Sequence, residues 1–427
     1  MFVRWIAVVV GLMVWVPRGE TAAARPNFII IMADHLGREW LGCYGGEGLG
    51  TPNIDQLANS GTRFETCYSS SHSSVSQVEF LTGRYPFRTG WVWHNDVPRW
   101  GNPYFDWENE TTFARPLRTA GYHTAMFGDW RLNALRTQPD ALKMHGFDEH
   151  RVWLHAESEE GEADVQQISV NEAVRNLVDD GSWESMTRSL TNFVGRFRDE
   201  RFLAYMQFPM SLPSRNEPGG YRAAVRTLDQ TIGEVVSNLE ALRIHGRTVV
   251  ILTSASGSLA TTTRAWGERV RGGQGSMRDV GINVPMIVRG SYYVRAGEVI
   301  KAGVDFSDVF PSLLEMAGVL RPRGRELDGH SFAGYLRGGG VVNPRAWVFS
   351  QYGYDRVIRH GPYKVYRNGL MFDMSDDLLE RHNIGASGVS EVVGVGEGLM
   401  RVMKGLPKDR LLKFPVARRM VIRQLGQ

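Results

Sequence analysis

The stretch NFIIIMADH, residues 27–35, is an unbroken apolar run that ends in a carboxylate and an imidazole. Such runs are typical of parallel strands that are buried on both faces. Asp34 and His35 then follow the carboxyl end of the strand, and ligands bind at that edge of an open α/β sheet. The stretch therefore predicts a buried parallel strand whose carboxyl end leads into a binding site.

Further apolar runs of the same kind recur along the chain. They are HTAMFG (residues 123–128), FLAYMQF (202–208), TVVILTS (248–254) and VPMIVRG (284–290). Helical patterns occur at residues 51–61, 221–243 and 307–319. Because strands alternate with helices, we predict an α/β fold over residues 25–340, a large α/β/α sandwich with a mainly parallel sheet.

The last part of the chain has a different pattern. Four short strand-like segments with glycine-containing connections follow one another, namely WVFSQYG (347–353), RVIRHG (356–361), YKVYRNG (363–369) and LMFDM (370–374). Short strands joined by tight turns predict an antiparallel sheet. We therefore expect a second, small C-terminal domain over residues 341–427.

Residues 1–24 have the pattern of a secretory signal peptide. Arg4 precedes an apolar run from Trp5 to Val16, and three alanines end at Ala24. The run is shorter than the ~20 apolar residues that a membrane-spanning helix needs. We therefore predict cleavage near Ala24 and a secreted or periplasmic protein, with an uncleaved membrane anchor as the alternative.

The composition of the 427 residues, 42% hydrophobic and 22% charged, excludes a disordered chain.

Residues 401–427 contain eight lysines and arginines and a single acid, Asp409. This basic tail could meet an anionic surface, although a solvated helical face is the commoner role of such a run. We expect no nucleic-acid partner. Whether the two cysteines, Cys43 and Cys67, pair is left open by their spacing.

Segments along almost the whole chain resemble the sulfatase family of the alkaline phosphatase superfamily. They include TPNIDQLANSGTRF (51–64), LTGRYPFRTG (81–90), GYHTAMFGDWRL (121–132), TVVILTSASG (248–257) and LMFDMSDDLLERHNI (370–384), in the family's order. The resemblance implies a large α/β domain and a small C-terminal domain with a four-stranded antiparallel sheet and a helix.

The resemblance also implies a chemistry. Family members hydrolyse sulfate esters with a formylglycine, which is made from the first residue of a CxPSR or SxPSR signature. A bound calcium ion and lysine, arginine and histidine side chains neutralise the sulfate oxygens. A chain with these groups would be a sulfuric ester hydrolase.

Ser73 takes the position of the nucleophile in SSHSSVSQVEFLTGR, residues 70–84. Val75 replaces the signature proline and Gln77 replaces the arginine, so formylglycine is the least favoured of three interpretations. Ser73 can also bind an anion at a helix N-terminus, or it can cap that helix. We favour the cap, because serine is common at such positions.

The metal-binding positions of the family are changed as well. Its calcium ligands are two adjacent aspartates after the first strand and an Asp-Asn pair after a later strand. Here these positions hold Asp34 and His35, and Ala255 and Ser256. Calcium takes about six to eight oxygen ligands, which this set does not supply. We expect no cofactor, and calcium only if Asp34 and His35 still hold it.

Other sulfate-binding positions are substituted too. Asp129 and Arg131 replace the lysine and histidine of a GKWHLG motif. Gln274 replaces a second lysine, and Ser211 replaces another histidine. A carboxylate in contact with a sulfate would repel it by ~1 kcal/mol or more. Pairing of Arg131 with Asp129 would leave this part of the site neutral.

Aromatic side chains are concentrated in residues 87–107, in a region that approaches the active-site rim in the family. Trp91, Trp93, His94 and Trp100 are our candidates for binding a sugar ring with an anionic substituent. The alternative is that these side chains pack the rim against the large domain.

Three functions follow from these observations. The preferred one is a secreted, non-catalytic pseudosulfatase that binds a sulfated or acidic glycan or a protein partner. The second is an active sulfatase or a related phosphate ester hydrolase that uses Ser73. The third is a structural or membrane-surface protein that acts through its basic tail.

Overall fold

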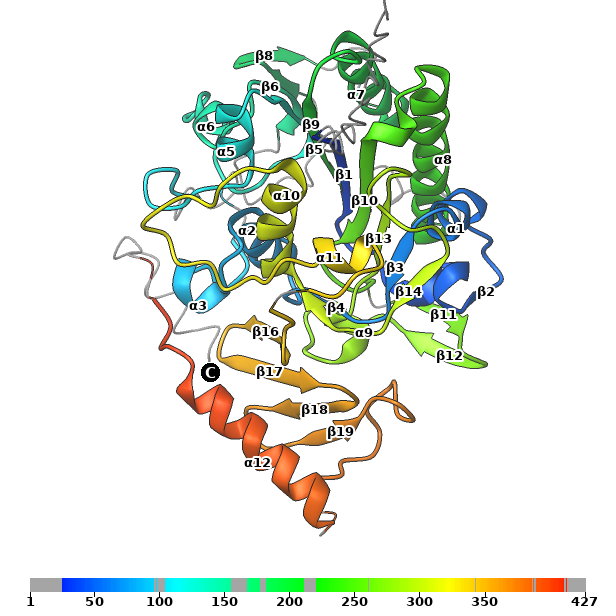
Figure 1. Ribbon diagram of the computed structural model, residues 1–427, viewed down its shortest axis with the longest axis vertical. Coiled ribbons are helices and arrows are strands. Elements are labelled where there is room, and N and C mark those ends of the chain that lie inside the picture. The colour runs from blue at the N-terminus through cyan, green and yellow to red at the C-terminus, as the bar shows by residue number, and fades with distance from the viewer. Residues whose placement is uncertain are drawn as a thin grey trace, which may run out of the picture.

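Figure 1 shows the protein as a computed structural model, in which a large α/β body lies above a small sheet and a long helix. The structure describes residues 25–95, 97, 104–154, 167–176, 182–210, 220–259, 261–341, 343–385, 387, 389–410 and 412. The predicted signal peptide lies outside these residues, as does most of the basic tail.

A sheet of ten strands forms the centre of the large domain. Its strands are β1 (Asn27–Ala33), β3 (Thr62–Phe64), β5 (His123–Asp129), β6 (Glu149–Leu154), β7 (Gln167–Val170), β8 (Ala173–Asn176), β9 (Phe202–Phe208), β10 (Thr248–Ser254), β13 (Met286–Arg289) and β14 (Glu298–Ile300). They lie in the order β14-β3-β13-β10-β1-β9-β5-β6-β7-β8. The apolar run at residues 27–35 therefore provides a buried parallel strand, as predicted, and this strand lies in the middle of the sheet.

The five neighbouring strands β10, β1, β9, β5 and β6 are parallel, whereas the next strand on each side, β13 beside β10 and β7 beside β6, runs antiparallel to them. The segment VPMIVRG differs from the expectation of a parallel strand, because its strand β13 pairs antiparallel with β10 and places Arg289 opposite Val250. No long crossover helix separates the two strands in the chain, and antiparallel neighbours do not need one.

Smaller sheets and short helices are attached to the large domain. One contains β2 (Gly46–Glu47), β11 (Thr262–Ala265) and β12 (Glu268–Arg271), and another contains β4 (Cys67–Tyr68) and β15 (Val304–Asp305). Short 3-10 helices lie at Arg38–Trp40, Gly42–Tyr44, His245–Arg247 and Phe306–Asp308. Cys43 and Cys67 are both free thiols, so they do not pair.

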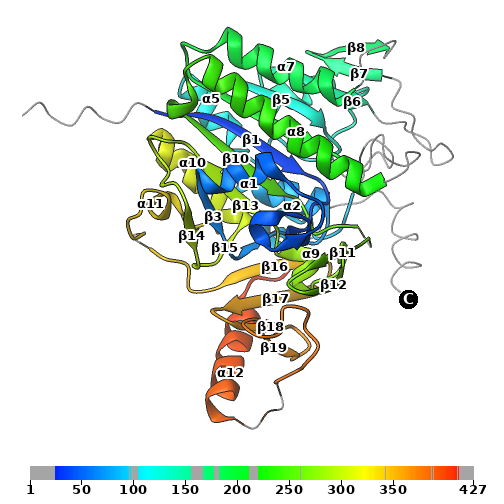
Figure 2. The ribbon, with the colours of Figure 1, turned by 90° about the vertical axis from the view of Figure 1, so that its right-hand side faces the viewer.

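Helices cover both faces of the large sheet. They are α1 (Pro52–Asn59), α2 (Ser73–Thr82), α3 (Pro86–Thr89), α5 (Ala114–Thr119), α6 (Ala141–Met144), α7 (Trp183–Arg196), α8 (Gly220–Ala241), α9 (Asp279–Ile282), α10 (Val309–Ala317) and α11 (Ala333–Leu336). Alternate residues of β1 enter two separate cores: Phe28 and Ile30 pack with α2, α5 and α10, and Ile29 and Ile31 pack with α1, α7 and α8. Figure 2 shows α7 and α8 crossing one face of the sheet.

Helix α8 illustrates why these faces form. Its buried apolar residues Val225, Leu228, Ile232, Val235 and Leu239 are spaced by three or four positions, so they form one stripe along the helix. The stripe packs on the sheet, and the buried carboxylate of Asp229 accepts hydrogen bonds from Asn53 and from the N–H of Ile54 in α1. No helix of the described residues is long and apolar enough to cross a membrane.

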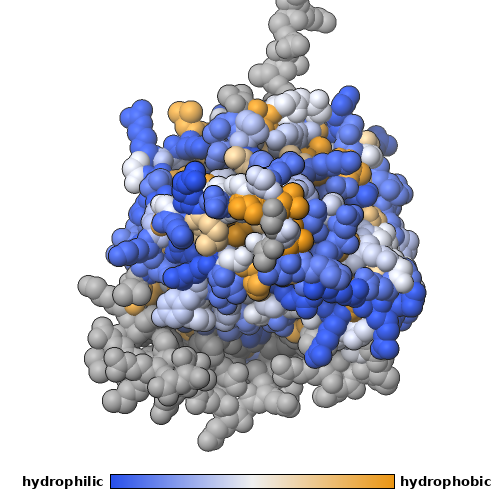
Figure 3. Space-filling view, turned by 90° about the horizontal axis from the view of Figure 1, so that it is seen from below, coloured by the Kyte–Doolittle hydropathy of each residue, from blue (hydrophilic) through white to orange (hydrophobic). Residues whose placement is uncertain are grey.

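The small domain consists of a four-stranded antiparallel sheet and one helix, as predicted. The strands are β16 (Val348–Tyr352), β17 (Asp355–His360), β18 (Tyr363–Tyr366) and β19 (Met371–Asp373), and the helix is α12 (Ser390–Gly405). Phe349 and Ile358 of the sheet pack against Leu399 and Met403 of the helix. The outer end of the domain exposes Val389 and other apolar side chains, and Figure 3 shows an apolar area within a mainly hydrophilic surface there.

The first part of the predicted basic tail is integrated into the fold. Met403 is buried under the small sheet, Asp409 forms an ion pair with Arg356, and Arg410 pairs with Glu110. The remaining cations of the tail, from residue 413 onward, lie outside the described residues. The domain boundary near Val341 stays a prediction, and it falls between the end of α11 and the start of β16.

Candidate functional site

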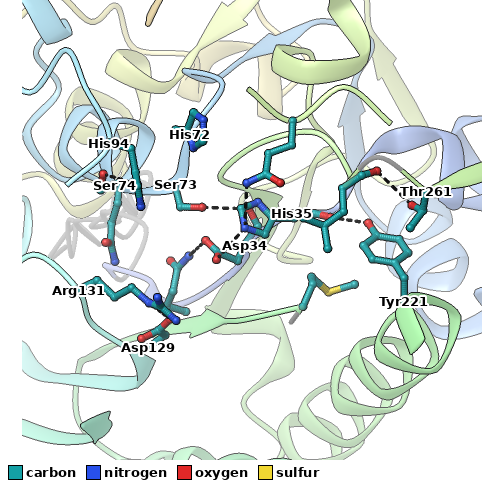
Figure 4. Close-up of a pocket in the computed structure, with 15 residues that line it drawn as sticks. Asp34, His35, His72, Ser73, Ser74, His94, Asp129, Arg131, Tyr221 and Thr261 are labelled. Atoms are coloured by element: carbon teal, nitrogen blue, oxygen red, sulfur yellow. Dashed lines mark hydrogen bonds and ion pairs between the residues drawn. The ribbon is translucent and has the colours of Figure 1, made fainter. Parts of the chain in front are cut away.

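A cavity of about 470 Å³ opens at the carboxyl ends of the parallel strands, where the sequence predicts a site. Figure 4 shows its lining side chains, which come from β5, β9, α2, α8 and seven connecting segments. They are Asp34, His35, His72, Ser73, Ser74, Gln77, His94, Asp129, Arg131, Gln207, Met210, Tyr221, Leu259, Thr261 and Gln274.

Seven of the residues singled out from the sequence meet in this cavity. They are Asp34, His35, Ser73, His94, Asp129, Arg131 and Gln274. Residues 34, 73, 129 and 274 are far apart in the chain, so the parallel strands and α2 bring them together. The structure therefore brings these positions together in one cavity, while the role of each residue stays a prediction.

The aromatic candidates lie elsewhere. Trp91 is only 2% exposed and packs edge to face with Phe105 in the core, so the prediction that it binds a ligand is wrong. Burying this large apolar ring is more favourable than presenting it to water. Trp93 is 36% exposed and contacts Tyr352 and Tyr354 of the small domain instead of lining the cavity. Trp100 lies outside the described residues, as does Ser211.

Ser73 is the first residue of α2, and the N-cap position belongs to His72, whose side chain makes no capping hydrogen bond. The hydroxyl of Ser73 is 3.4 Å from the main-chain oxygen of Asp34, to which it can donate. It thus contacts the end of β1 and not a free N–H group of its helix. A capping hydroxyl accepts a hydrogen bond from a main-chain N–H group of its own helix. The Ser73 hydroxyl instead donates to a carbonyl oxygen outside the helix, so the interpretation of Ser73 as a helix cap is wrong.

The neighbouring serine has a base beside it. The Ser74 hydroxyl lies 3.0 Å from His94 Nδ1 and accepts a hydrogen bond of 3.0 Å from the main-chain N–H of Asn95. His72 stacks between the rings of His94 and Tyr352, at centroid distances of 5.2 and 4.5 Å. Sequence reasoning missed this arrangement, because nothing in the run of serines distinguishes Ser74 from Ser73.

The imidazole of His35 connects the positions where the family places calcium ligands. Its Nδ1 is 2.9 Å from Ser256 Oγ, and its Nε2 is 3.2 Å from Asp34 Oδ2. Gln274 Nε2 is 3.3 Å from the same Nε2 atom, and Gln207 donates to Asp34 at 3.3 Å. Burial lowers the pKa of His35, so the ring is uncharged at neutral pH.

This donor set does not fit calcium. A hard divalent cation needs several oxygen ligands, whereas here one carboxylate contacts an imidazole that is bonded to a hydroxyl, and Ala255 has no oxygen in its side chain. Among the described residues, no three side chains of histidine, cysteine, aspartate or glutamate cluster so as to hold a metal ion. The only acidic ligand at the position, Asp34, is instead bonded to side chains of the protein.

A second carboxylate also lines the cavity. Asp129 ends β5 and is 2.9 Å from Nε of Arg131, with side-chain exposures of 3% and 30%. The two groups lie beside each other in Figure 4, as the local pairing predicted from the sequence requires. Arg131 is thus neutralised before any ligand arrives.

The charge balance of the cavity follows from these groups. Burial lowers the pKa of His72 to about 4, with a smaller contribution from the nearby His94. At neutral pH the cavity therefore contains two carboxylates, Asp34 and Asp129, and one guanidinium, Arg131. This excess of negative charge disfavours the binding of an anionic sulfate. It suits uncharged ligand groups, such as hydroxyls, that donate and accept hydrogen bonds.

Comparison with known proteins shows the family directly. The family model described as Sulfatase matches residues 26–319. This chain belongs to the sulfatase family. The match covers the large domain from the start of β1 to the end of α10, and with it every segment that lines the cavity.

Individual relatives are more distant. The chain is similar to the steryl-sulfatase of Mus musculus, with 27% identity over 425 residues that cover 77% of this chain and 68% of the relative. Among solved structures, Ps i-CgsB in complex with k-i-k-neocarrahexaose has a TM-score of 0.75 and 22% identity, covering 89% and 92% of the two chains. BT4656 in complex with its substrate D-glucosamine-2-N,6-O-disulfate has a TM-score of 0.71 and 20% identity, covering 89% and 97%. At these identities, the solved structures show the fold alone.

Proposed function

We propose that this protein is a pseudosulfatase that binds a glycan and does not hydrolyse sulfate esters by the chemistry of its family. The observation that carries the proposal is the His35 ring, which bridges Asp34 and Ser256 where a sulfatase holds its cation. The nucleophile position supports it, since Ser73 has no base within hydrogen-bond distance among the described residues. In the same cavity, the carboxylate of Asp129 stands where the family motif has a lysine.

The ligand class is inferred from the cavity and from the relatives. Two solved neighbours are in complex with k-i-k-neocarrahexaose and with D-glucosamine-2-N,6-O-disulfate, so the fold accommodates sugars in other proteins. In this chain the cavity is lined by hydroxyl, amide and imidazole groups, which suit the hydroxyls of a sugar. The two carboxylates favour an unsulfated unit of the glycan at this place over a sulfated one.

The proposal includes export from the cell. It rests on the sequence pattern of residues 1–24, with its basic start, short apolar run and alanines before residue 25. Expression of the full chain should yield a protein whose first residue lies near Arg25 in the medium or the periplasm. N-terminal sequencing checks this, and a protein that keeps residues 1–24 in the membrane fraction would contradict it.

The test of function combines three measurements on one purified sample. Mass spectrometry of the peptide with Ser73 should find an unmodified serine, and metal analysis should find no stoichiometric calcium. Turnover of 4-methylumbelliferyl sulfate should be equal in the wild type and in Ser73→Ala. Formylglycine, bound calcium, or sulfate release that Ser73→Ala abolishes would overturn the proposal.

Binding is measured separately on a glycan array that carries matched sulfated and unsulfated sugars. Gln274→Ala, which removes an amide from the cavity wall, should lose the bound sugar, while a variant outside the cavity, Arg321→Ala, should keep it. Failure of the wild type to bind any sugar, with an intact thermal transition, would contradict glycan binding and leave the absence of sulfatase chemistry standing.

The Ser74 and His94 pair favours a second candidate function, the hydrolysis of a carboxylic or phosphate ester. His94 Nδ1 is placed to accept the proton as Ser74 Oγ attacks the ester. The ester bond to the alcohol breaks, His94 returns the proton to the leaving alcohol, and water then hydrolyses the acyl- or phosphoryl-serine. Ser74 is only 3% exposed, so the ester must reach it from the cavity side. Turnover of an aryl acetate or aryl phosphate that is lost in Ser74→Ala but kept in Ser73→Ala would establish this function.

A further inference from the structure

A second and larger cavity lies between the large and small domains. Its volume is about 660 Å³, and it shares no lining residue with the first cavity. Its walls come from the connection after β1, from β3, from the β11–β12 turn and from the connection between β14 and β15. The small domain contributes the approach to β16, the β17–β18 turn and the segment after β19. We call this cavity the interdomain groove.

Positive charge dominates the lining of the interdomain groove. It contains Arg38, Arg63, Lys301, Arg345 and Arg359, whereas Glu65 is the single acid of the lining. Arg345 is neutralised by Asp305 and Asp308, and Arg359 by Asp279. Within the part of the chain that the structure describes, Arg38, Arg63 and Lys301 form no ion pair with a carboxylate. Three cations therefore face one carboxylate across the groove.

Two of these cations are held by aromatic rings. The guanidinium carbon of Arg38 lies 5.6 Å from the ring centre of Trp266, and that of Arg63 lies 5.8 Å from the ring of Tyr44. Arg38 Nη1 also donates to the main-chain oxygen of Glu65 at 2.6 Å. Stacking on a ring orients a guanidinium without neutralising it, so N–H groups remain for an anionic ligand.

The aromatic support is itself fixed. Trp266 has a φ of 54°, which is rare for a bulky residue, and Gly267 follows with a φ of 80° in the turn between β11 and β12. The indole N–H donates to the main-chain oxygen of Tyr44 at 2.9 Å. This bond and the stacked Arg38 offset the unfavourable backbone of Trp266, and they keep the half-buried ring at the groove wall.

Lys301 extends the positive charge along the same surface. Strand β14 pairs in parallel with β3, with Val299 opposite Arg63, and the N–H of Glu65 donates to the oxygen of Ile300. Lys301 directly follows β14 and lines the groove together with Arg63, and strand spacings place their Cα atoms about 8 Å apart. Lys301 is exposed and Arg63 is half-buried. The two cations can thus contact separate anionic groups of one extended ligand.

We propose that the interdomain groove binds an acidic glycan, a sugar chain that carries sulfate or carboxylate groups. Separated cations meet the spaced anions of such a chain, and the edges of Trp266 and Trp347 offer apolar surface to the sugar rings. An acidic peptide would gain its affinity by pairing with a free strand edge, but β14 itself contributes no lining residue. The site goes beyond the proposed pseudosulfatase pocket and does not depend on whether that pocket is catalytic.

The test uses the mature chain and calorimetric titration with a heparin-derived octasaccharide at low and at high ionic strength. The double variant Arg63→Glu and Lys301→Glu should weaken binding about tenfold or more, since two attractive contacts become repulsive. The control Arg321→Glu with Arg323→Glu changes the net charge equally at exposed positions outside the groove and should change affinity less than about twofold. A neutral oligosaccharide of the same length, without sulfate or carboxylate groups, should not bind.

Each other outcome has a meaning. Equal losses in both double variants would show general charge attraction and overturn the site. Polyglutamate that binds as tightly as the octasaccharide, with the same loss in the groove variant, would assign the groove to acidic peptides and overturn the glycan. Thermal unfolding checks that the variants fold, and the single variant Lys301→Glu, at an exposed position, should by itself weaken binding about threefold. Binding in the groove with no binding of sugar in the first cavity would contradict only the proposed pocket.

Discussion

The two cavities of this protein differ in the way their charges are arranged. In the pocket at the strand ends, Asp34 and Asp129 outnumber Arg131, and the buried rings of His35 and His72 are uncharged. In the interdomain groove, Arg38, Arg63 and Lys301 face a single carboxylate. Of the two cavities, it is thus the groove whose described lining contains cations without a carboxylate partner.

The difference shows how a scaffold can keep its fold while its site changes. The pocket is built where parallel strands end, and the residues that surround it bond to one another: His35 to Ser256, Asp129 to Arg131 and Ser74 to His94. These mutual bonds satisfy buried polar groups without a metal ion or an anion. In the groove, by contrast, stacked and exposed cations have donors left for a ligand.

The groove itself contains two kinds of cation, and Arg345→Met separates them. Arg345 bonds to Asp305 and Asp308, whose side chains are 0% and 2% exposed, so the variant leaves two buried carboxylates unpaired. We expect the free energy of unfolding to fall by about 3 to 5 kcal/mol. Urea denaturation measures the loss.

The matched control is Arg63→Met, which removes a groove cation that lies over Tyr44 and has no carboxylate partner. Its unfolding free energy should change by no more than about 0.5 kcal/mol, as for an ordinary surface residue. Similar losses in the two variants would mean that the groove cations are all structural, and the contrast between paired and unpaired cations would fail.

The pocket should respond to pH through His72. Its pKa is about 4 in the folded protein because burial disfavours the charged ring, against 6.5 for an exposed histidine. The unfolded chain therefore takes up a proton first as the pH falls, so stability is complete above pH 6.5 and is lost on the way down to about 4. At pH 5 this single group accounts for about 2 kcal/mol of lost stability.

His72→Phe tests this assignment, since a phenyl ring keeps the stacking on Tyr352 and cannot be protonated. Denaturation between pH 7 and pH 4.5 should show a shallower decline for the variant than for the wild type. His382→Phe, which replaces a ring that is 82% exposed, controls for the loss of a surface histidine. Parallel curves for His72→Phe and the wild type would show that His72 does not cause the decline.

Much of the fold could be predicted because the pattern of burial is local in the sequence. The runs at residues 202–208 and 248–254 are the observed strands β9 and β10, since strands covered on both faces must be apolar throughout. The orientation of β13 could not be predicted in the same way. A four-residue apolar strand has the same composition in either direction, and its direction depends on the connection that leads to it.

The sequence could predict which residues line the candidate site where these residues lie at strand ends or on α2. Asp34, Asp129 and Ser73 are of this kind. Contacts made by loops were not. Trp91 and Trp93 are two positions apart and equally aromatic, yet one is buried beside Phe105 and the other contacts the small domain. The interdomain groove was also missed, because it joins segments from both domains whose cations have no common motif.

Asp129→Asn changes the charge of the pocket with little change in volume, and it gives the smallest of the expected effects. The wild-type carboxylate neutralises Arg131 at 2.9 Å and repels an anionic ligand. The amide removes that negative charge, so the affinity of the pocket for a sulfated monosaccharide should rise about fivefold, equivalent to about 1 kcal/mol. Titration with the sugar and its unsulfated form measures the change, while octasaccharide binding in the interdomain groove should stay as in the wild type. A loss of affinity for the sulfated sugar would mean that Asp129 holds Arg131 in place for an anion, and the pocket and the groove would then both be anion sites.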